Sequence, residues 1–436
     1  MPDRKVAAMG AVVEGGVAGL RARYEEVRKR TLALCKPLTA EDMMVQSCAE
    51  ASPAKWHLAH TAWFFESFVL GEFGAGYRVF DADFGWLFNS YYGSIAGFPD
   101  KRLRASFSRP GLEKVLAYRA HVDAGVELLL EGDVTEEALR RVELGLHHEE
   151  QHQELLLTDI QHALWTNPLR PVYLAEDAAG DAPDVDGIRA GGAATEMEFA
   201  EFKGGLVEIG HDGAGFSFDN ERPRHRVWLE PYGVGTRLVT CGEYAGFIAD
   251  GGYRRAELWL SDGWRAVQER GWETPLYWRK ADGEWRIYSL RGERALGEVT
   301  ATPVAHVSLY EADAYARWAG KRLATEAEWE HAAASAAVVG NLLDRGRLRP
   351  EVAAEGGLQQ MFGDCWEWTG SAYLGYPGFK PLAGALGEYN GKFMSGQMVL
   401  RGGSCVTPEA HIRASYRNFF GPETRWQFSG IRLAEG

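Results

Sequence analysis

The chain changes character once along its length, and this change is what most constrains its fold. From residue 17 to residue 166, apolar residues recur at helical spacing and glycines are rare within the periodic stretches. From Phe199 onward, glycine, proline and tryptophan are frequent, and the apolar runs are short enough for strands. The 436 residues also exceed the roughly 250–300 residues at which one hydrophobic core stops growing. The sequence therefore predicts a multi-domain protein, with an all-helical domain followed by a loop-rich α+β domain.

The composition of the segment between these two parts of the chain predicts where the domains begin and end. Residues 167–195 are rich in Pro, Gly, Ala and Asp and are predicted to form a linker. The first domain is then residues 1–166 and the second residues 196–436. Helices are predicted over residues 56–70, 112–131, 136–164 and 309–319, and strands over residues 205–209 and 226–229. A further helix is predicted to begin after Thr325, where Thr325-x-x-Glu328 is a capping box.

Charge and cysteine content exclude several classes of function. Lys and Arg number 47 against 61 Asp and Glu, a net charge of −14, whereas nucleic acids and anionic membranes are bound by clustered cations. The sequence contains no run of about 18 uncharged apolar residues, so no membrane-spanning helix is predicted. The N-terminal stretch has no convincing signal-peptide cleavage site. The five cysteines are scattered without a C-x-x-C pair, which favours a reducing cytoplasm. No pattern predicts an oligomeric state.

The densest chemistry lies in one predicted helix. His148 and His152 are four residues apart, so they share a helix face and can bind one metal ion. A third ligand is available from His57 or His60, on another predicted helix. Glu154 lies two residues beyond His152 and is predicted to orient a ligand imidazole by a hydrogen bond. The alternative is a solvated, charge-rich helix face that holds no metal.

These histidines carry a resemblance to a known family. The run from His148 to Glu154, with the upstream Trp-x-x-Ala-His60, resembles the iron motif of DinB-like helical bundles, in particular that of the sulfoxide synthases of ergothioneine biosynthesis, the EgtB family. His57 and His147 stand outside the register of that motif and are interpreted as packing or polar neighbours. The resemblance implies an Fe(II) cofactor with three ligands: His60, His148 and His152.

The second domain resembles the formylglycine-generating-enzyme-like, C-type-lectin-like fold. The matching segments include residues 218–225, 240–244, 320–330, 363–369, 400–404 and 430–434. Most of these residues are interpreted as structural. A true formylglycine-generating enzyme needs a copper-binding cysteine pair after its Arg-Gly-Gly-Ser segment, but here Cys405 stands alone. That oxidase chemistry is therefore disfavoured, Cys405 is interpreted as a small buried residue, and the second domain is expected to form one wall of an iron pocket.

The resemblance implies a reaction and its small-molecule substrates. In the EgtB family, O₂-dependent C–S bond formation joins a thiol to N-α-trimethylhistidine (hercynine), and with cysteine the product is hercynylcysteine S-oxide. Members that use γ-glutamylcysteine carry an Asp and an Arg where this chain has Phe420 and Thr424. The loss of both charges favours cysteine. Arg102 and Arg104 are expected to bind its carboxylate as a fork, with a solvated surface patch as the alternative.

The resemblance also assigns residues to the hercynine pocket. Gln151 matches the glutamine that contacts the imidazole, and Asn418 is expected at the betaine end. Phe419 and Phe420 are expected to hold the trimethylammonium group by cation–π attraction, although one of them is expected to be core. Tyr389 matches a position in the substrate wall.

A proton donor is expected near the bound oxygen. Some family members place a tyrosine at a position that is aliphatic here, around Leu386. Tyr91 and Tyr92, beside a glycine turn in the first domain, are proposed instead, because a phenol with a pKa near 10 can protonate a basic reduced-oxygen species. The alternative is that both rings only pack.

Other readings of the sequence stay open. The same scaffold serves γ-glutamylcysteine, or a selenium donor in place of the thiol. From a different class, DinB-like metal-dependent thiol transferases use three histidines without O₂. The second domain also resembles lectin-like modules, which leaves a non-enzymatic binding protein as an alternative. Iron content and O₂ uptake would separate these readings.

Overall fold

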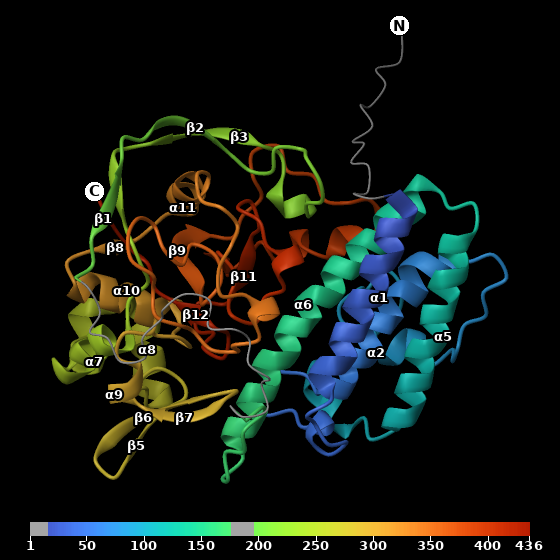
Figure 1. Ribbon diagram of the computed structural model, residues 1–436, viewed down its shortest axis with the longest axis horizontal. Coiled ribbons are helices and arrows are strands. Elements are labelled where there is room, and N and C mark those ends of the chain that lie inside the picture. The colour runs from blue at the N-terminus through green and yellow to red at the C-terminus, as the bar shows by residue number, and fades with distance from the viewer. Residues whose placement is uncertain (1–15, 176–195) are drawn as a thin grey trace, which may run out of the picture.

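Four long helices build the N-terminal part of the computed structural model, which describes residues 16–175 and 196–436. They are α1 (Gly16–Cys35), α2 (Ala54–Phe65), α5 (Leu112–Glu131) and α6 (Glu136–Thr166), with the short helices α3 (Gly71–Phe73) and α4 (Phe84–Leu87) between α2 and α5. They pack side by side on one side of the molecule (Figure 1). The three long helices predicted there are confirmed. The first 15 residues of the expected helical domain, and residues 176–195 of the expected linker, lie outside the described residues.

The longest helix, α6, has local reasons to begin where it does. Thr135 is its N-cap, and its side chain accepts a hydrogen bond from the backbone N–H of Ala138. Glu136 and Glu137 in the first turn complement the positive end of the helix dipole. Its 31 residues correspond to about 46 Å of helix. This length lets α6 run the whole depth of the helical domain and beyond.

A buried ion-pair network ties three of the helices together. Glu149 on α6 is fully buried and accepts hydrogen bonds from Arg28 on α1 (2.7 Å), from Arg119 on α5 (2.8 Å) and from Thr31 (2.6 Å). Burial alone would raise the pKa of Glu149, but Arg28 and Arg119 outweigh it and lower that pKa to about 2. A charged carboxylate therefore holds α1, α5 and α6 in register.

The second domain is built from short strands in several small sheets. One four-stranded sheet has the order β1 (Phe199–Phe202), β4 (Tyr232–Gly235), β13 (Leu433–Glu435) and β8 (Arg322–Leu323). Another has the order β11 (Asn418–Phe420), β10 (Met398–Arg401), β9 (Trp366–Ala372) and β12 (Ser429–Gly430). Two ribbons complete the strands, β2 (Gly205–Ile209) with β3 (His225–Leu229), and β5 (Trp278–Ala281) with β6 (Glu284–Ser289) and β7 (Gly292–Ala295). The strands predicted over 205–209 and 226–229 are β2 and β3.

Helices cover the sheets of this domain, and much of the chain between them is loop. They are α7 (Cys241–Ala249), α8 (Ser261–Arg270), α9 (Leu296–Val299), α10 (Leu309–Trp318) and α11 (Glu326–Ala333). The capping box predicted at Thr325 forms at the start of α11. Arg401, which lies in one of the segments interpreted as structural, is fully buried and donates to the carbonyls of Ser415 (2.9 Å) and Tyr416 (2.6 Å). Cys405 is fully buried, as expected.

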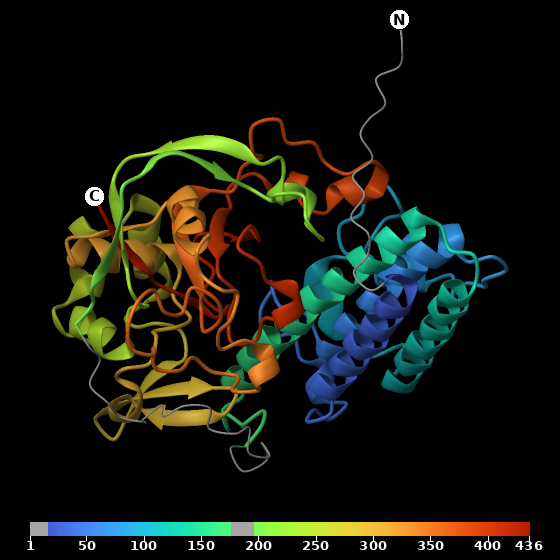
Figure 2. The same cartoon turned by 45° about the horizontal axis from the view of Figure 1, so that its top comes forward.

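Helix α6 is also where the two domains meet (Figure 2). Glu154 on α6 accepts hydrogen bonds from Thr407 (2.6 Å), from Ser404 (3.2 Å) and from the indole N–H of Trp366, all in the second domain. The prediction that Glu154 orients a ligand imidazole is therefore wrong. Two residues along a helix turn the side chain by about 200°, so Glu154 points away from His152 toward the second domain.

The chain that leaves α6 is packed against both domains. Tyr173 is 6% exposed and donates its hydroxyl hydrogen to the carbonyl of Leu34 at 2.6 Å, while the N–H of Leu174 donates to the carbonyl of Leu290 at 3.1 Å.

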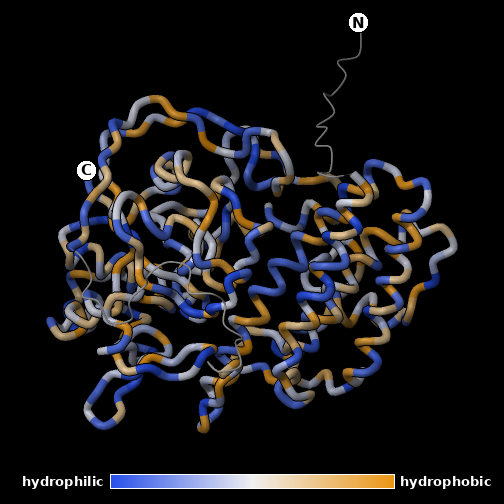
Figure 3. Tube along the Cα trace, viewed as in Figure 1, coloured by the Kyte–Doolittle hydropathy of each residue, from blue (hydrophilic) through white to orange (hydrophobic). Residues whose placement is uncertain are grey.

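The helices carry both hydrophobic and hydrophilic residues along their length (Figure 3). Among the described residues, no helix combines the length and apolar character needed to cross a membrane.

Candidate metal centre and substrate cavity

Three histidines converge between α2 and α6. His60 comes from α2, and His148 and His152 lie one turn apart on α6; one ring nitrogen from each lies within 4.8 Å of the others. His60 and His148 are no more than 1% exposed. The three residues named by the sequence motif thus form a single cluster, while the nearby His57 and His147 do not belong to it.

The nitrogen atoms of this cluster fit a metal ion. His60 uses Nδ1 to donate to the carbonyl of Phe88 at 2.7 Å, which leaves its Nε2 free. That Nε2 and both ring nitrogens of His148 are buried and have no hydrogen-bond partner among the described residues. Each buried ring nitrogen without a hydrogen-bond partner reduces the free energy of unfolding by about 1–3 kcal/mol. Coordination of a metal ion would remove this cost. Imidazole ligands suit iron, zinc, copper and nickel ions.

Burial also keeps the three imidazoles neutral. It lowers the pKa of His148 to about 3 and lowers the pKa values of His60 and His152 well below that of a free histidine. The neighbouring histidines of the cluster lower the last two further, because two charged imidazoles would repel each other. At neutral pH the lone pairs of the cluster are therefore available to a metal.

His57 lies in direct contact with the cluster. Its Nδ1 is 2.8 Å from Nδ1 of His152, and its Nε2 is 3.1 Å from Oδ2 of Asp159. The sequence motif identifies His57 as a packing or polar neighbour, and in the structure it is hydrogen-bonded to a candidate ligand. No sequence pattern links it to Asp159, which is 102 residues away.

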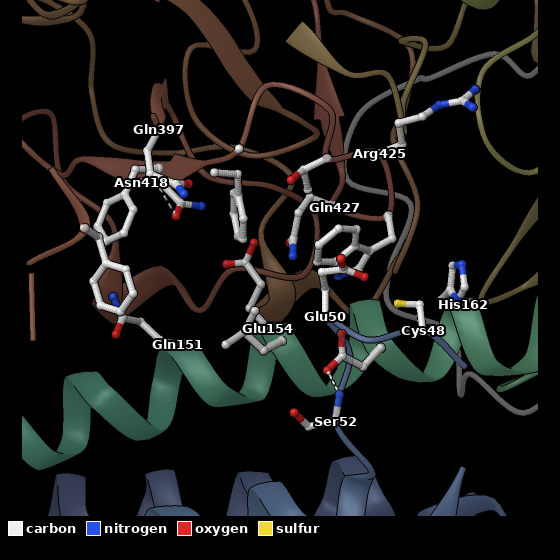
Figure 4. Close-up of a pocket in the computed structure, with 18 of the residues that line it drawn as sticks. Cys48, Glu50, Ser52, Gln151, Glu154, His162, Gln397, Asn418, Arg425 and Gln427 are labelled. Carbon is white, nitrogen blue, oxygen red and sulfur yellow. Dashed lines mark hydrogen bonds between the residues drawn. The ribbon is translucent and has the colours of Figure 1, made fainter. Parts of the chain in front are cut away.

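A cavity of about 970 Å³ opens beside the cluster, between α6 and the second domain. Gln151 and Glu154 enter it from α6, Asn418 and Gln427 face them from the second domain, and Ser52 approaches from the loop before α2 (Figure 4). His148 and His152 are themselves part of its wall. The candidate metal centre thus faces a space that both domains enclose.

Gln151 sits at the centre of a hydrogen-bond network in this wall. Its amide N–H donates to the hydroxyl of Tyr416 at 2.6 Å, and its amide oxygen accepts from the hydroxyl of Tyr389. The ring centroid of Tyr389 is 5.8 Å from that of His148. Tyr389 therefore lies in the cavity wall next to the candidate metal ligands, and Tyr416, which sequence reasoning missed, completes the network.

The aromatic segment from the C-terminal region lines another part of the cavity. Asn418, Phe419 and Phe420 all contribute to its wall on β11. Phe419 is stacked on Tyr373 with 4.0 Å between ring centroids, whereas Phe420 contacts Trp426 edge-on at 6.3 Å.

The tyrosine pair of the first domain is divided between core and cavity. Tyr92 is fully buried against Trp63 and Phe68, and Tyr91 lines the cavity. Their hydroxyl groups are 3.5 Å apart. Burial raises the pKa values of both phenols, so both are protonated at neutral pH.

The structure does not form the fork expected from Arg102 and Arg104. Residues 101–106 are a 3₁₀-helix, in which side chains three residues apart share a face. Arg104 therefore lines the cavity together with Lys101, while the side chain of Arg102 is 74% exposed and paired with Asp100 at 2.5 Å. Sequence reasoning missed Lys101, although a spacing of three pointed to it.

Arg104 is a buried cation that forms no ion pair within the described part of the chain. Its guanidinium lies 3.4 Å from the ring centroid of Trp56 and donates to the hydroxyls of Ser52 (2.8 Å) and Ser90 (3.1 Å). Burial lowers its pKa to about 9. A cation held in this way in a cavity wall is suited to bind a ligand carboxylate.

Comparisons with known proteins match both halves of the chain. The family model described as the sulfatase-modifying factor enzyme 1-like domain matches residues 192–347 and 346–436, and that of the DinB superfamily matches residues 23–156. A hercynine oxygenase of Mycobacterium tuberculosis is 38% identical over 246 residues, which is 50% of this chain and 56% of the relative. One of Mycolicibacterium smegmatis is 37% identical with the same coverage. Ergothioneine biosynthesis protein 1 of Schizosaccharomyces pombe is 24% identical over 50% of this chain and 28% of its own length. These alignments thus span about half or less of each relative.

Proposed function

The chain belongs to the sulfatase-modifying factor enzyme 1-like family, in the two-domain form of the EgtB proteins, and on this premise we propose that it is an iron-dependent oxygenase that joins cysteine to hercynine. The observation that carries the proposal is the cluster of His60, His148 and His152 at the wall of a cavity that both domains enclose. Buried ring nitrogens of His60 and His148 have no hydrogen-bond partner among the described residues. A binding module has no use for such a cluster.

The proposed reaction balances without an external reductant. Hercynine loses the hydrogen on the imidazole carbon between the two nitrogens, cysteine loses its thiol hydrogen, and a C–S bond forms between them with the loss of two electrons. Oxidation of that sulfur to a sulfoxide removes two more. The four electrons reduce O₂, of which one atom enters the sulfoxide and the other leaves as water.

Iron bound to the three histidines would supply the activation of O₂. The chain's own residues orient the substrates. We assign the imidazole of hercynine to the amide of Gln151, which Tyr389 and Tyr416 hold in place through hydrogen bonds. Asn418 and Phe419, which line the same cavity, are assigned to the betaine end, where an aromatic face attracts a quaternary ammonium group by about 0.5–2 kcal/mol.

The thiol substrate needs an anchor for its carboxylate. Two cations at the cavity wall can serve as this anchor. They are Arg104 and Lys101, which lie on the same face of the 3₁₀-helix. Phe420 and Thr424 line the cavity where charged groups would grip a glutamyl extension, and both are uncharged. The cavity's other guanidinium groups include those of Arg270 and Arg425, which are paired with Glu423 and Glu311. We therefore propose free cysteine as the sulfur donor.

A proton must reach the reduced oxygen atom that leaves as water. We assign this proton to the hydroxyl of Tyr91, which lines the cavity and remains protonated at neutral pH. The hydroxyl of Tyr92 lies 3.5 Å behind it and accepts a hydrogen bond from the hydroxyl of Tyr91. Such general acid catalysis typically contributes a factor of about 10²–10⁴.

The experiment that tests the proposal is a single-turnover product analysis. The protein is loaded with Fe(II) without oxygen and then exposed to air with hercynine and either cysteine or γ-glutamylcysteine, and the products are identified by mass spectrometry. We expect hercynylcysteine S-oxide, with cysteine preferred. Preference for the dipeptide would contradict the assignment of the donor alone. No adduct with either thiol, despite bound iron, would contradict the function.

A further inference from the structure

His57 connects a candidate metal ligand to a buried carboxylate. Its Nδ1 lies 2.8 Å from Nδ1 of His152, and its Nε2 lies 3.1 Å from Oδ2 of Asp159. His57 is 2% exposed and Asp159 is 6% exposed. The same Asp159 oxygen accepts the backbone N–H of Ser52 at 2.7 Å, which fixes the carboxylate against the loop before α2.

The chemistry of these contacts determines which nitrogen of His152 is free. An ionised carboxylate can only accept hydrogen bonds, so Nε2 of His57 must carry the hydrogen. Nδ1 of a neutral His57 is then an acceptor, and Nδ1 of His152 must donate to it. The lone pair of His152 is left on Nε2 alone, where a metal ion can bind it.

The other two histidines of the cluster lack such support within the described part of the chain. His60 donates to a neutral backbone carbonyl, that of Phe88, and neither nitrogen of His148 has a hydrogen-bond partner. His152 is thus the one member of the cluster connected to a negative charge in the residues the structure describes. A carboxylate behind a ligand imidazole fixes its tautomer and makes it a stronger ligand.

We propose that His57 and Asp159 are positioning residues that hold His152 in its metal-binding tautomer and orientation through a buried carboxylate–imidazole–imidazole relay. The inference rests on the proposed function, because it requires that His60, His148 and His152 bind the metal. Neither positioning residue touches the metal or the substrates in this role. Their effect is on metal affinity and on the geometry around the metal.

Co(II) tests the relay without turnover, because its visible absorption reports the number and arrangement of its ligands. Anaerobic titration of the metal-free protein gives the dissociation constant and the spectrum. Three variants are compared with the wild type: His57→Phe removes both nitrogens, His57→Asn keeps an acceptor close to the original Nδ1, and Asp159→Asn removes only the charge. His121→Gln is the matched control, since His121 lies on α5 and bonds to the carbonyl of Arg78.

We expect His57→Phe to weaken Co(II) binding by about 10–100-fold and to change the spectrum, as is typical when the partner of a ligand imidazole is lost. Asp159→Asn should weaken binding by about 10-fold, and His57→Asn should recover part of the loss. The melting temperatures of the metal-free variants identify any variant that has not folded, and Asp159→Asn then stands in for His57→Phe.

The outcomes separate this inference from the proposed function. Unchanged affinity and an unchanged spectrum in folded His57→Phe or Asp159→Asn would overturn the relay while leaving the metal site in place. A wild-type protein that binds neither Co(II) nor Fe(II) would overturn the proposed function, and the relay with it. Retention of metal by His152→Ala but not by His57→Phe would make His57 itself a ligand and would also overturn the relay.

Discussion

The indole of Trp56 is stacked on the imidazole of His60, with 4.4 Å between the ring centroids and 14° between the ring planes. The guanidinium of Arg104 lies over the same indole. One side chain therefore supports both a candidate metal ligand and the cation assigned to the substrate carboxylate. This arrangement would couple the position of a carboxylate bound at Arg104 to that of a metal bound at the histidines, and reactions between bound partners depend on such relative positioning.

Removal of one candidate ligand should abolish metal binding. His148→Ala leaves two imidazoles in the cluster, and we expect the purified variant to hold no stoichiometric iron and to form no sulfoxide. Iron content by atomic absorption and product by mass spectrometry check this, with His121→Ala as a variant that loses an imidazole elsewhere. Normal iron content and turnover in His148→Ala would remove the proposed cluster.

The two tyrosines should differ in their effect. Tyr91→Phe should slow sulfoxide formation by about 100-fold, as expected for the loss of a general acid, and should divert the thiol to simple oxidation. Tyr92→Phe should have a smaller effect, because its hydroxyl contacts that of Tyr91 rather than the cavity. The rate of sulfoxide formation and the ratio of sulfoxide to oxidised thiol check this prediction. A normal rate in both single variants and in the double variant would refute the assignment of the proton donor to this tyrosine pair.

Neighbouring arginines provide an internal test of the carboxylate anchor. Arg104→Gln should raise the KM for cysteine by about 10–100-fold, which corresponds to the loss of a charged hydrogen bond worth about 1.5–3 kcal/mol. Arg102→Gln, two residues away on the exposed side of the same 3₁₀-helix, should leave KM unchanged. Steady-state kinetics with varied cysteine concentration check this prediction. A raised KM in Arg102→Gln and an unchanged KM in Arg104→Gln would instead identify the exposed Arg102 as the anchor.

The buried network around Glu149 should make stability depend on acid. Its pKa in the folded protein is about 2, against 4.5 for a free glutamate, so the unfolded chain binds more protons between these values. The stability that Glu149 gains from its two arginine partners is fully present above about pH 4.5 and is lost as the pH falls toward 2. Glu149→Gln leaves Arg119 buried without its carboxylate partner and leaves Arg28 with Asp123 alone, and it should cost about 3–5 kcal/mol at neutral pH.

Urea unfolding of the wild type and Glu149→Gln at several pH values checks this prediction. The difference in unfolding free energy between the two proteins should shrink as the pH falls below 4.5. A difference that stays constant down to the lowest pH at which both fold would show that Glu149 is not charged in the native state.

Regular spacing made part of this molecule predictable. His148 and His152 share a helix face at any position on a helix, and the threonine and glutamate at 325 and 328 cap a helix through local bonds, so both features follow from the chain itself. His57 and Asp159 meet only because α2 packs against α6, and no pattern in one sequence shows such a contact. Arg102 was misassigned because the 3₁₀-helix around it, with three residues per turn, cannot be distinguished locally from other turns.

The contacts among the residues that line the cavity are still harder to predict from the sequence. Gln151 and Tyr389 are 238 residues apart and touch because loops of the second domain return to α6. The family resemblance assigned both residues to the substrate pocket, but their contact with each other and with Tyr416 depends on the packing of the two domains. Long-range contacts of this kind are set by the whole fold rather than by a local motif.

Because α6 carries two of the candidate metal ligands and also faces the second domain, the two halves of the chain contribute different parts of one cavity wall. The histidine cluster belongs to the helical bundle, whereas Tyr389, Asn418 and Phe420 of the cavity wall come from a loop and a short strand of the second domain. Exchanges in the C-terminal half can therefore reshape the cavity while the three histidines stay in place, and a laboratory effort to change the ligand that the cavity accepts has its natural target there.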